Sequence, residues 1–140
     1  MSKTFVGSLP VSALCADTVL RVDPDADLWS VAAALAAAEV GVLVVGSGDD
    51  VGGVVSERDV VQALAAHRCV GDTTAAEIAH RALVWCDADA DVADVAEEMM
   101  EHYVRHVLVE RDGHLVGIVS ARDLLGAYAS GESADPDDDE

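Results

Sequence analysis

Apolar and polar residues follow two patterns along the chain. At Leu28, Val31, Ala32 and Leu35 the apolar residues recur with the spacing of one face of an α-helix. Short apolar runs rich in β-branched residues, separated by Gly and Asp, are typical of strands. The first half of the chain is therefore predicted to contain a short helix, a strand, a helix, two strands and a final helix, at Val11–Ala16, Val19–Val22, Leu28–Leu35, Val42–Val45, Val51–Val55 and from near Glu57 onward.

The same pattern returns 64 residues later. Sliding the chain by 64 positions aligns Leu20–Val61 with Val84–Leu125 without a gap, and Gly53–Asp59 (GVVSERD) falls on Gly117–Asp123 (GIVSARD). Such a long ungapped match indicates a tandem duplication. The second copy is predicted to repeat the order of elements, at Ala75–His80, Ala82–Cys86, Val92–Met99, His106–Val109, Leu115–Val119 and from near Ala121 onward.

One copy alone, of about 50 residues, cannot bury both faces of a three-stranded sheet. We expect an α+β or α/β fold of two β-α-β-β-α copies, packed sheet to sheet around a pseudo-two-fold axis. The copies would occupy residues 8–68 and 73–129, followed by a disordered acidic tail at 130–140. The final helices carry more apolar residues than this packing needs, which predicts a homodimer. These residues are Val60, Val61, Leu64, Leu124 and Leu125.

Composition narrows the class of protein. With 8 Lys+Arg against 27 Asp+Glu the net charge is −19, which argues against nucleic-acid binding and against anionic membrane surfaces. Apolar residues make up 51% of the chain, enough to form a core. No apolar run approaches the roughly 18 residues of a membrane-spanning helix, and the first residues lack the apolar segment of a signal peptide. We therefore expect a cytoplasmic protein without a membrane partner.

The excess of acidic residues also indicates the salt environment in which the protein works. Lys3 is the only lysine, and six of the acids lie in the last nine residues. This composition is similar to that of cytoplasmic proteins from salt-loving archaea, where molar salt shortens the screening length to about 3 Å. An acidic partner-binding surface and an origin in a GC-rich mesophilic bacterium are the alternatives.

Metal and catalytic motifs are not recognisable in the sequence. Cys15, Cys69 and Cys86 are odd in number and widely spaced, so they are predicted to be small buried hydrophobic residues, with a redox or disulfide role as the alternative. The five histidines form no HxxxH or HExxH pair, and no nucleophile is matched to a base. We predict no metal site, no cofactor and no enzyme activity.

Two Asp-x-Asp-x-Asp clusters, at 23–27 and 87–91, resemble the opening of a calcium loop. The glycine that such a loop needs at its sixth position is absent, because Leu28 and Val92 stand there. We interpret the clusters as helix caps, with Asp27 and Asp91 as the N-cap residues.

The Gly-x-x-Ser-x-x-Asp element occurs in both copies where a strand meets a helix. Ser56 with Asp59, and Ser120 with Asp123, are predicted to form capping boxes. A functional role is compatible with capping, because a helix N-terminus with a hydroxyl favours phosphate and a carboxylate can accept both hydroxyls of a ribose. The glycine before each serine permits a close approach to the strand backbone.

In these elements the chain resembles a tandem pair of CBS domains, the regulatory module of the cystathionine β-synthase type. The resemblance covers Val11–Tyr128 and rests on the element order, the two Gly-x-x-Ser-x-x-Asp elements and Val104–Val107. It implies clefts between paired domains that bind AMP, ADP, ATP or S-adenosylmethionine. The implied ligand residues are Ser56 and Asp59 in one cleft, Ser120 and Asp123 in the other, and, for the base, the backbone of Thr18, Val19, Leu20, Ala82, Leu83 and Val84.

The chain departs from the family pattern and from internal symmetry. Val44 and Leu108 replace a proline that is usual in the second strand. Arg105 and His106 stand where the first copy has Gly41 and Val42. Because arginine is a fork-shaped phosphate donor, we expect the second copy's cleft to bind the more highly charged ligand.

The arginines also have surface roles as alternatives. Arg105 could instead pair with Glu101 or Glu110. Arg58 and Arg122 are further ligand candidates that could instead face solvent or neighbouring acids.

The sequence thus predicts a stand-alone regulatory module that senses adenine nucleotides and acts on its own assembly or on a partner protein. A structural or protein-interaction module, with clefts empty or filled by other ligands, is the alternative.

Overall fold

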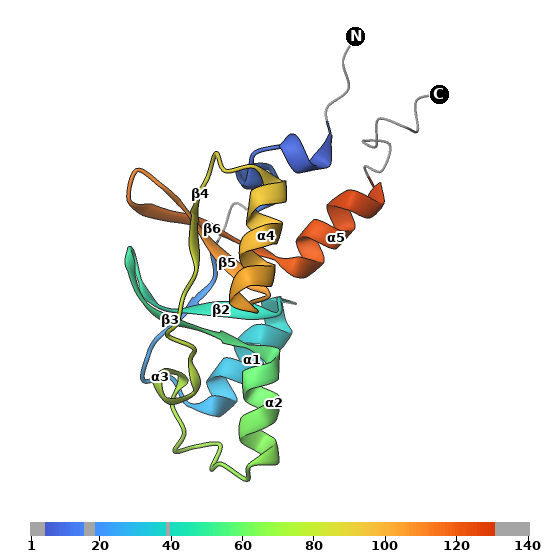
Figure 1. Ribbon diagram of the computed structural model, residues 1–140. Coiled ribbons are helices and arrows are strands. Elements are labelled where there is room, and N and C mark those ends of the chain that lie inside the picture. Colours follow the sequence, from blue (N-terminus) through green and yellow to red (C-terminus); the bar gives the residue numbers. More distant parts are fainter. Residues whose placement is uncertain (1–4, 16–18, 39, 131–140) are drawn as a thin grey trace. The chain divides into compact units, whose positions relative to one another are not determined.

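The computed structural model describes residues 5–15, 19–38 and 40–130 (Figure 1). The chain divides into two compact units. The central unit is Val19–Leu83, and the terminal unit combines the chain up to Thr18 with the chain from Val84 onward. Each unit holds one three-stranded sheet, in the order β1-β2-β3 or β4-β5-β6, together with helices. This is the α+β architecture expected for two repeats.

In the central unit, β1 runs parallel to β2, and β3 runs antiparallel to β2. Its elements are β1 (Arg21–Val22), α1 (Leu28–Ala38), β2 (Val42–Ser47), β3 (Asp50–Ser56), α2 (Glu57–Ala65) and α3 (Ala75–Ile78). One face of the sheet packs on the apolar stripe predicted for α1. The core consists of Leu28, Val31, Leu35, Leu43, Val45, Val55, Val60, Ala63 and Ala75.

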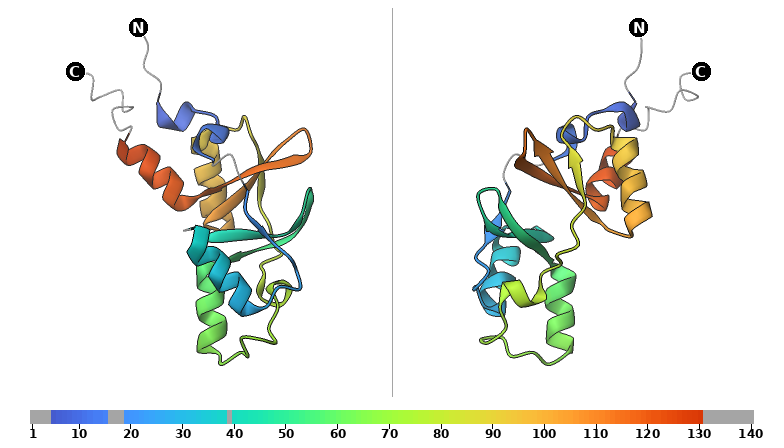
Figure 2. Two further views of the ribbon diagram at one scale, coloured as in Figure 1. Left: turned by 180° about the vertical axis from the view of Figure 1, so that it is seen from behind. Right: turned by 60° about the vertical axis from the view of Figure 1, so that its left-hand side comes forward.

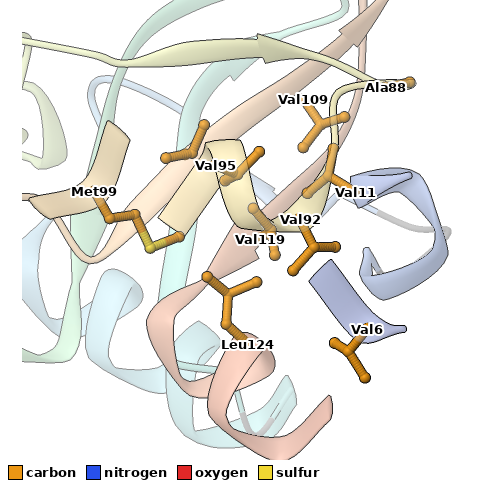
Figure 3. Packing of buried hydrophobic residues seen from close by; sticks show 10 residues of the cluster. Val6, Val11, Ala88, Val92, Val95, Met99, Val109, Val119 and Leu124 are labelled. Atoms are coloured by element: carbon orange, nitrogen blue, oxygen red, sulfur yellow. The ribbon is translucent and has the colours of Figure 1, made fainter. Parts of the chain in front are cut away.

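The terminal unit repeats this plan. Its elements are η1 (Val6–Ser8), η2 (Val11–Leu14), β4 (Trp85–Asp87), α4 (Val92–His102), β5 (His106–Arg111), β6 (His114–Ser120) and α5 (Ala121–Ser130). Figure 3 shows side chains from η1, η2, α4, β5, β6 and α5 meeting in one core, with Met99 at one end of the cluster and Val6 at the other. None of the helices in the described ranges is long and apolar enough to cross a membrane.

Strand register reproduces the duplication residue by residue. Val44 lies opposite Val54 in the first sheet, and Leu108 lies opposite Ile118 in the second. Both hairpins carry an irregularity at the same place, after Val45 and after Val109. The predicted repeat of 64 residues is therefore a repeat of backbone hydrogen bonding.

The leading segment of each copy packs on the body of the other copy. Val11 N–H donates to the carbonyl oxygen of Ala90 at 2.8 Å, and Ala75 N–H donates to that of Ala26 at 2.8 Å. Val11 and Ala75 are both completely buried. Figure 2 shows η1 beside α4 although the two lie far apart in the sequence. Each compact unit thus combines the leading segment of one copy with the strands and helices of the other.

The leading helices are shorter than predicted. η2 is a 3₁₀ turn that ends at Leu14, and α3 ends at Ile78 because Ala79 has extended backbone angles. His80 then pairs with Val54 at the edge of β3 instead of continuing the helix. The prediction of a helix through His80 is therefore wrong.

Candidate functional site

The first Ser–Asp pair closes the N-terminus of α2, and we call Ser56 with Asp59 the first corner. The Ser56 N–H donates to Asp59 Oδ2 at 2.7 Å, and the Asp59 N–H donates to Ser56 Oγ at 3.3 Å. The Ser56 hydroxyl also donates to Oδ2 at 3.0 Å. This reciprocal arrangement is a capping box that pairs backbone donors otherwise left free at a helix start.

The second Ser–Asp pair, the second corner, lies at the start of α5. The Ser120 N–H donates to Asp123 Oδ2 at 2.9 Å, and the Asp123 N–H donates to Ser120 Oγ at 2.9 Å. Both predicted capping boxes are confirmed. In contrast to the first corner, Asp123 is exposed and its Oδ1 accepts no hydrogen bond from any described residue.

A glycine is required before the first corner because the chain itself approaches there. A Cβ on Gly53 would lie 2.7 Å from the carbonyl oxygen of His80 and 3.1 Å from the Cβ of Ala79. The neighbouring Val54 exchanges two backbone hydrogen bonds with His80, at 3.0 and 2.8 Å. The close approach predicted at this glycine is thus made by the segment after α3.

This approach brings His80 to the first corner. Its Nε2 lies 2.6 Å from Asp59 Oδ1, while the Asp59 residue is only 6% exposed. Sequence reasoning did not single out His80 as a site residue. No local pattern pointed to it, because His80 lies 21 positions after Asp59 and reaches it through the pairing with Val54.

Arg105 and His106 lie beside the second corner. The carbonyl oxygen of Arg105 accepts the N–H of Ala121, the first residue of α5, at 2.8 Å, and His106 pairs with Ser120 across the hairpin. The Arg105 side chain is exposed and makes no ion pair with Glu101, Glu110 or any other described residue. The alternative of a surface ion pair for Arg105 is therefore wrong.

Two further predicted residues lie in the first turns of the corner helices. Arg58 in α2 and Arg122 in α5 are both exposed, and within the described ranges neither forms an ion pair with Glu57 or another acid.

The predicted base-binding backbone lies just before the first strand of each copy. Val19 and Leu20 are half-buried before β1, and Leu83 and Val84 are half-buried before β4, whereas Ala82 is exposed. The sheets already use two of these carbonyl groups, since Leu20 accepts from Val44 and Val84 accepts from Leu108, each at 2.9 Å. Thr18 lies outside the described residues.

Comparison with known proteins identifies the family. The CBS domain family matches residues 11–66 and 75–130, which together form most of the chain. The chain belongs to the CBS domain family.

The chain is also similar to individual proteins and solved structures. Hypoxic response protein 1 of Mycobacterium tuberculosis is 35% identical over 88 residues, which are 61% of this chain and 62% of that protein. The match therefore spans about three fifths of that relative's length. A crystal structure of Hypoxic Response Protein I, with two coordinated zinc ions, has a TM-score of 0.69 at 29% identity over 84% of this chain and 97% of that one.

Other solved CBS structures contain adenosine derivatives. The CBS domain protein PAE2072 of Pyrobaculum aerophilum, complexed with AMP, is 31% identical, with a TM-score of 0.73 over 87% of this chain and 99% of that one. The CBS domain pair of protein MJ0100, in complex with 5-methylthioadenosine and S-adenosyl-L-methionine, has a TM-score of 0.78 at 21% identity over 87% and 97%. The latter likeness shows the shared fold alone.

Within the first CBS copy, sequence reasoning also missed Arg21. Its Nη1 is buried and has no hydrogen-bond partner among the residues that the structure describes. A buried guanidinium nitrogen without a partner is costly, and an anion would satisfy it. The available signal was one arginine interrupting the apolar run Val19–Val22.

The aspartate clusters of both CBS copies form turns. Asp23 Oδ1 accepts the N–H of Asp25, and Asp87 Oδ2 accepts that of Asp89, each at 2.8 Å. Asp27 caps α1 by accepting the Ser30 N–H at 2.8 Å, and this hydrogen bond lowers the pKa of Asp27. Asp91 occupies the N-cap position of α4, but its side chain makes no capping hydrogen bond, so that detail of the prediction is wrong.

The cysteines differ in environment. Cys15 and Cys86 are half-buried against the core of the terminal unit, and burial raises the pKa of each thiol to about 11. Asp123 adds to the raised pKa of Cys15. Cys69 is exposed in the turns after α2, so the prediction that it is buried is wrong.

One cluster on α4 has the geometry of a metal site. Glu98, Glu101 and His102 each offer a ligand atom within 4.8 Å of the others, and His102 Nε2 lies 3.3 Å from Glu98 Oε1. The i, i+3, i+4 spacing that brings them together was visible in the sequence and was not considered there.

Proposed function

We propose that this CBS pair is a regulatory module that binds an adenosine-containing ligand at its Ser–Asp corners. The observation that carries the proposal is the second corner, where Asp123 is exposed and no described residue donates a hydrogen bond to its Oδ1. The AMP complex of the 31% identical relative from Pyrobaculum aerophilum supports this choice of ligand class. AMP, ADP, ATP and S-adenosylmethionine remain the candidate ligands.

Each group at the second corner suits one part of a nucleotide. The free oxygen of Asp123 can accept a ribose hydroxyl, and the Ser120 hydroxyl at the start of α5 can meet a phosphate. The backbone of Arg105 lies at this helix start, and its exposed side chain is a planar charged donor that forms no ion pair with any described acid. This supports the second corner as the site for the more highly charged ligand.

Calorimetric titration of ATP and AMP into the chain and into R105A tests this assignment. Loss of a charge-assisted hydrogen bond is expected to weaken ATP binding about tenfold or more. R111A is the matched control and should bind ATP as the wild type does. Arg111 lies at the end of β5, the strand that follows Arg105, and its Nη1 already pairs with Asp89 Oδ1 at 3.5 Å. If R105A bound ATP as tightly as the wild type, the assignment of Arg105 to the ligand site would be wrong.

We also propose that a second copy of this chain covers the outer faces of α2 and α5. Val61 is 62% exposed and its counterpart Leu125 is 71% exposed; Leu64 and Tyr128 are a second equivalent pair and are also exposed. Duplicated apolar positions form similar surfaces on both copies, which suits an isologous dimer. Val60 and Leu124, by contrast, are buried in their own units.

Sedimentation equilibrium of V61D/L125D tests the dimer. The double variant is expected to be a monomer where the wild type is a dimer, because each charge would have to be buried unpaired. A wild-type monomer would contradict the proposal.

A protein-interaction module without a nucleotide is the second candidate, favoured by the exposed apolar residues on α2 and α5. If no adenine nucleotide gave heat in calorimetry or shifted the melting temperature, the protein-interaction module would be the correct candidate.

A further inference from the structure

The two Ser–Asp corners differ in one contact, although their backbones are alike. At the first corner His80 Nε2 lies 2.6 Å from Asp59 Oδ1, and the other oxygen of Asp59 accepts from the N–H and hydroxyl of Ser56. Both carboxylate oxygens are therefore used within the chain. At the second corner only Oδ2 of Asp123 is used by the described residues.

The difference follows from the sequence register. The offset of 64 places Ala16 where the other copy has His80. An alanine side chain has no hydrogen-bond donor, and none of the residues that the structure describes contacts Asp123 as His80 contacts Asp59.

The backbone of His80 is held firmly, while its side chain can move. Two hydrogen bonds to Val54 fix the backbone at the edge of β3. The imidazole-bearing side chain is 66% exposed, so a change of rotamer would free Asp59 Oδ1 without disturbing the core. Asp59 itself is buried and cannot turn away as easily.

We propose that His80 is an autoinhibitory latch on the first corner. Asp59 is buried and the imidazole lies on Oδ1, so a ribose can reach this oxygen only after the imidazole leaves, and the ligand must break a hydrogen bond to a carboxylate before it binds. The second corner has no such cost and fills first. Because the latch acts on a ligand corner, it rests on the proposed function, and it makes the module respond to two ranges of nucleotide concentration.

Calorimetry with AMP in molar KCl tests the latch. D123N weakens the second corner, so that binding to the first corner can be measured. D123N/H80A is expected to bind AMP about tenfold more tightly than D123N, the factor that one hydrogen bond to a charged group supplies. D123N/H80S should behave likewise. D123N/H102A is the matched control and should equal D123N, since His102 is also an exposed histidine beside a carboxylate.

An NMR experiment that keeps His80 tests the latch without the risk that a substitution at His80 disturbs the fold. In ¹⁵N-histidine-labelled D123N, saturating AMP is expected to shift the His80 imidazole signals and to leave those of His102 unchanged. Unshifted His80 signals, or D123N/H80A binding no tighter than D123N, would overturn the latch while leaving the proposed function intact. A wild-type chain that binds no AMP would overturn both.

Discussion

Val11 donates its backbone N–H to the carbonyl oxygen of Ala90, 79 positions further along the chain, at 2.8 Å. The equivalent bond in the other unit joins Ala75 to Ala26. Each compact unit therefore contains the leading segment of one copy and the strands of the other copy. The stability of each unit depends on this leading segment.

Shortening Val11 should therefore destabilise the terminal unit. V11A removes two methyl groups from a completely buried position and is expected to cost about 2 kcal/mol in free energy of unfolding. Urea denaturation checks this value. A13S, at an exposed position two residues away, is the control and should be neutral. Equal stability of V11A and the wild type would show that the leading segment contributes little.

Gly53 and Gly126 should respond to alanine in opposite directions. G53A places a Cβ 2.7 Å from a backbone oxygen of His80, so the segment must shift, and a loss of more than about 1 kcal/mol is expected. G126A meets nothing within 4 Å in α5 and should stabilise the helix by about 0.5–1 kcal/mol. Thermal unfolding of both variants provides the comparison. A G53A variant as stable as wild type would contradict the close approach.

Asp27 and Asp91 form a pair of equivalent positions of which only one caps its helix. D27A is expected to lower the melting temperature more than D91A, because only Asp27 accepts a backbone N–H. The pKa of Asp27 is lowered in the folded state, so its contribution is present above the ordinary value of 3.8 and is lost as the pH falls through the folded pKa. The difference between the variants should accordingly disappear in acid. A D91A effect as large as that of D27A would contradict this account.

Thiol alkylation should distinguish the three cysteines. At pH 8 iodoacetamide is expected to modify exposed Cys69 first and to reach Cys15 and Cys86 only after unfolding, because burial raises the pKa of both to about 11. For a thiol whose pKa is raised by folding, stability is complete below the unfolded value of 9.0 and falls as the pH rises toward 11. Peptide mass mapping of the native protein checks the order, and rapid labelling of Cys86 would contradict it.

The elements and their repetition could be predicted from local pattern. The helical stripe at Leu28 and Val31, the hairpins and both capping boxes all depend on residues close together in the sequence, where spacing determines geometry. The resemblance to CBS domains came from the same local elements and is confirmed.

The remaining features depend on contacts between distant residues. Nothing near His80 in the sequence indicates Asp59 as its partner, and the contact arises only because the chain after α3 pairs with Val54. The unsatisfied Nη1 of Arg21 likewise depends on burial, which periodicity alone does not give for one arginine in a strand. The sequence therefore showed only part of the difference between the two corners, namely that Arg105 in the second copy stands where the first copy has Gly41.

Titration of AMP into the wild type and D123N by calorimetry tests the central claim most directly. The wild type should bind AMP, and D123N should bind at least about tenfold more weakly because a hydrogen bond from ribose to a charged oxygen is lost. D112N, an exposed substitution at a positive-φ position in the neighbouring hairpin, should bind as the wild type does. Equal affinity in D123N and D112N, or no heat with the wild type, would contradict the account.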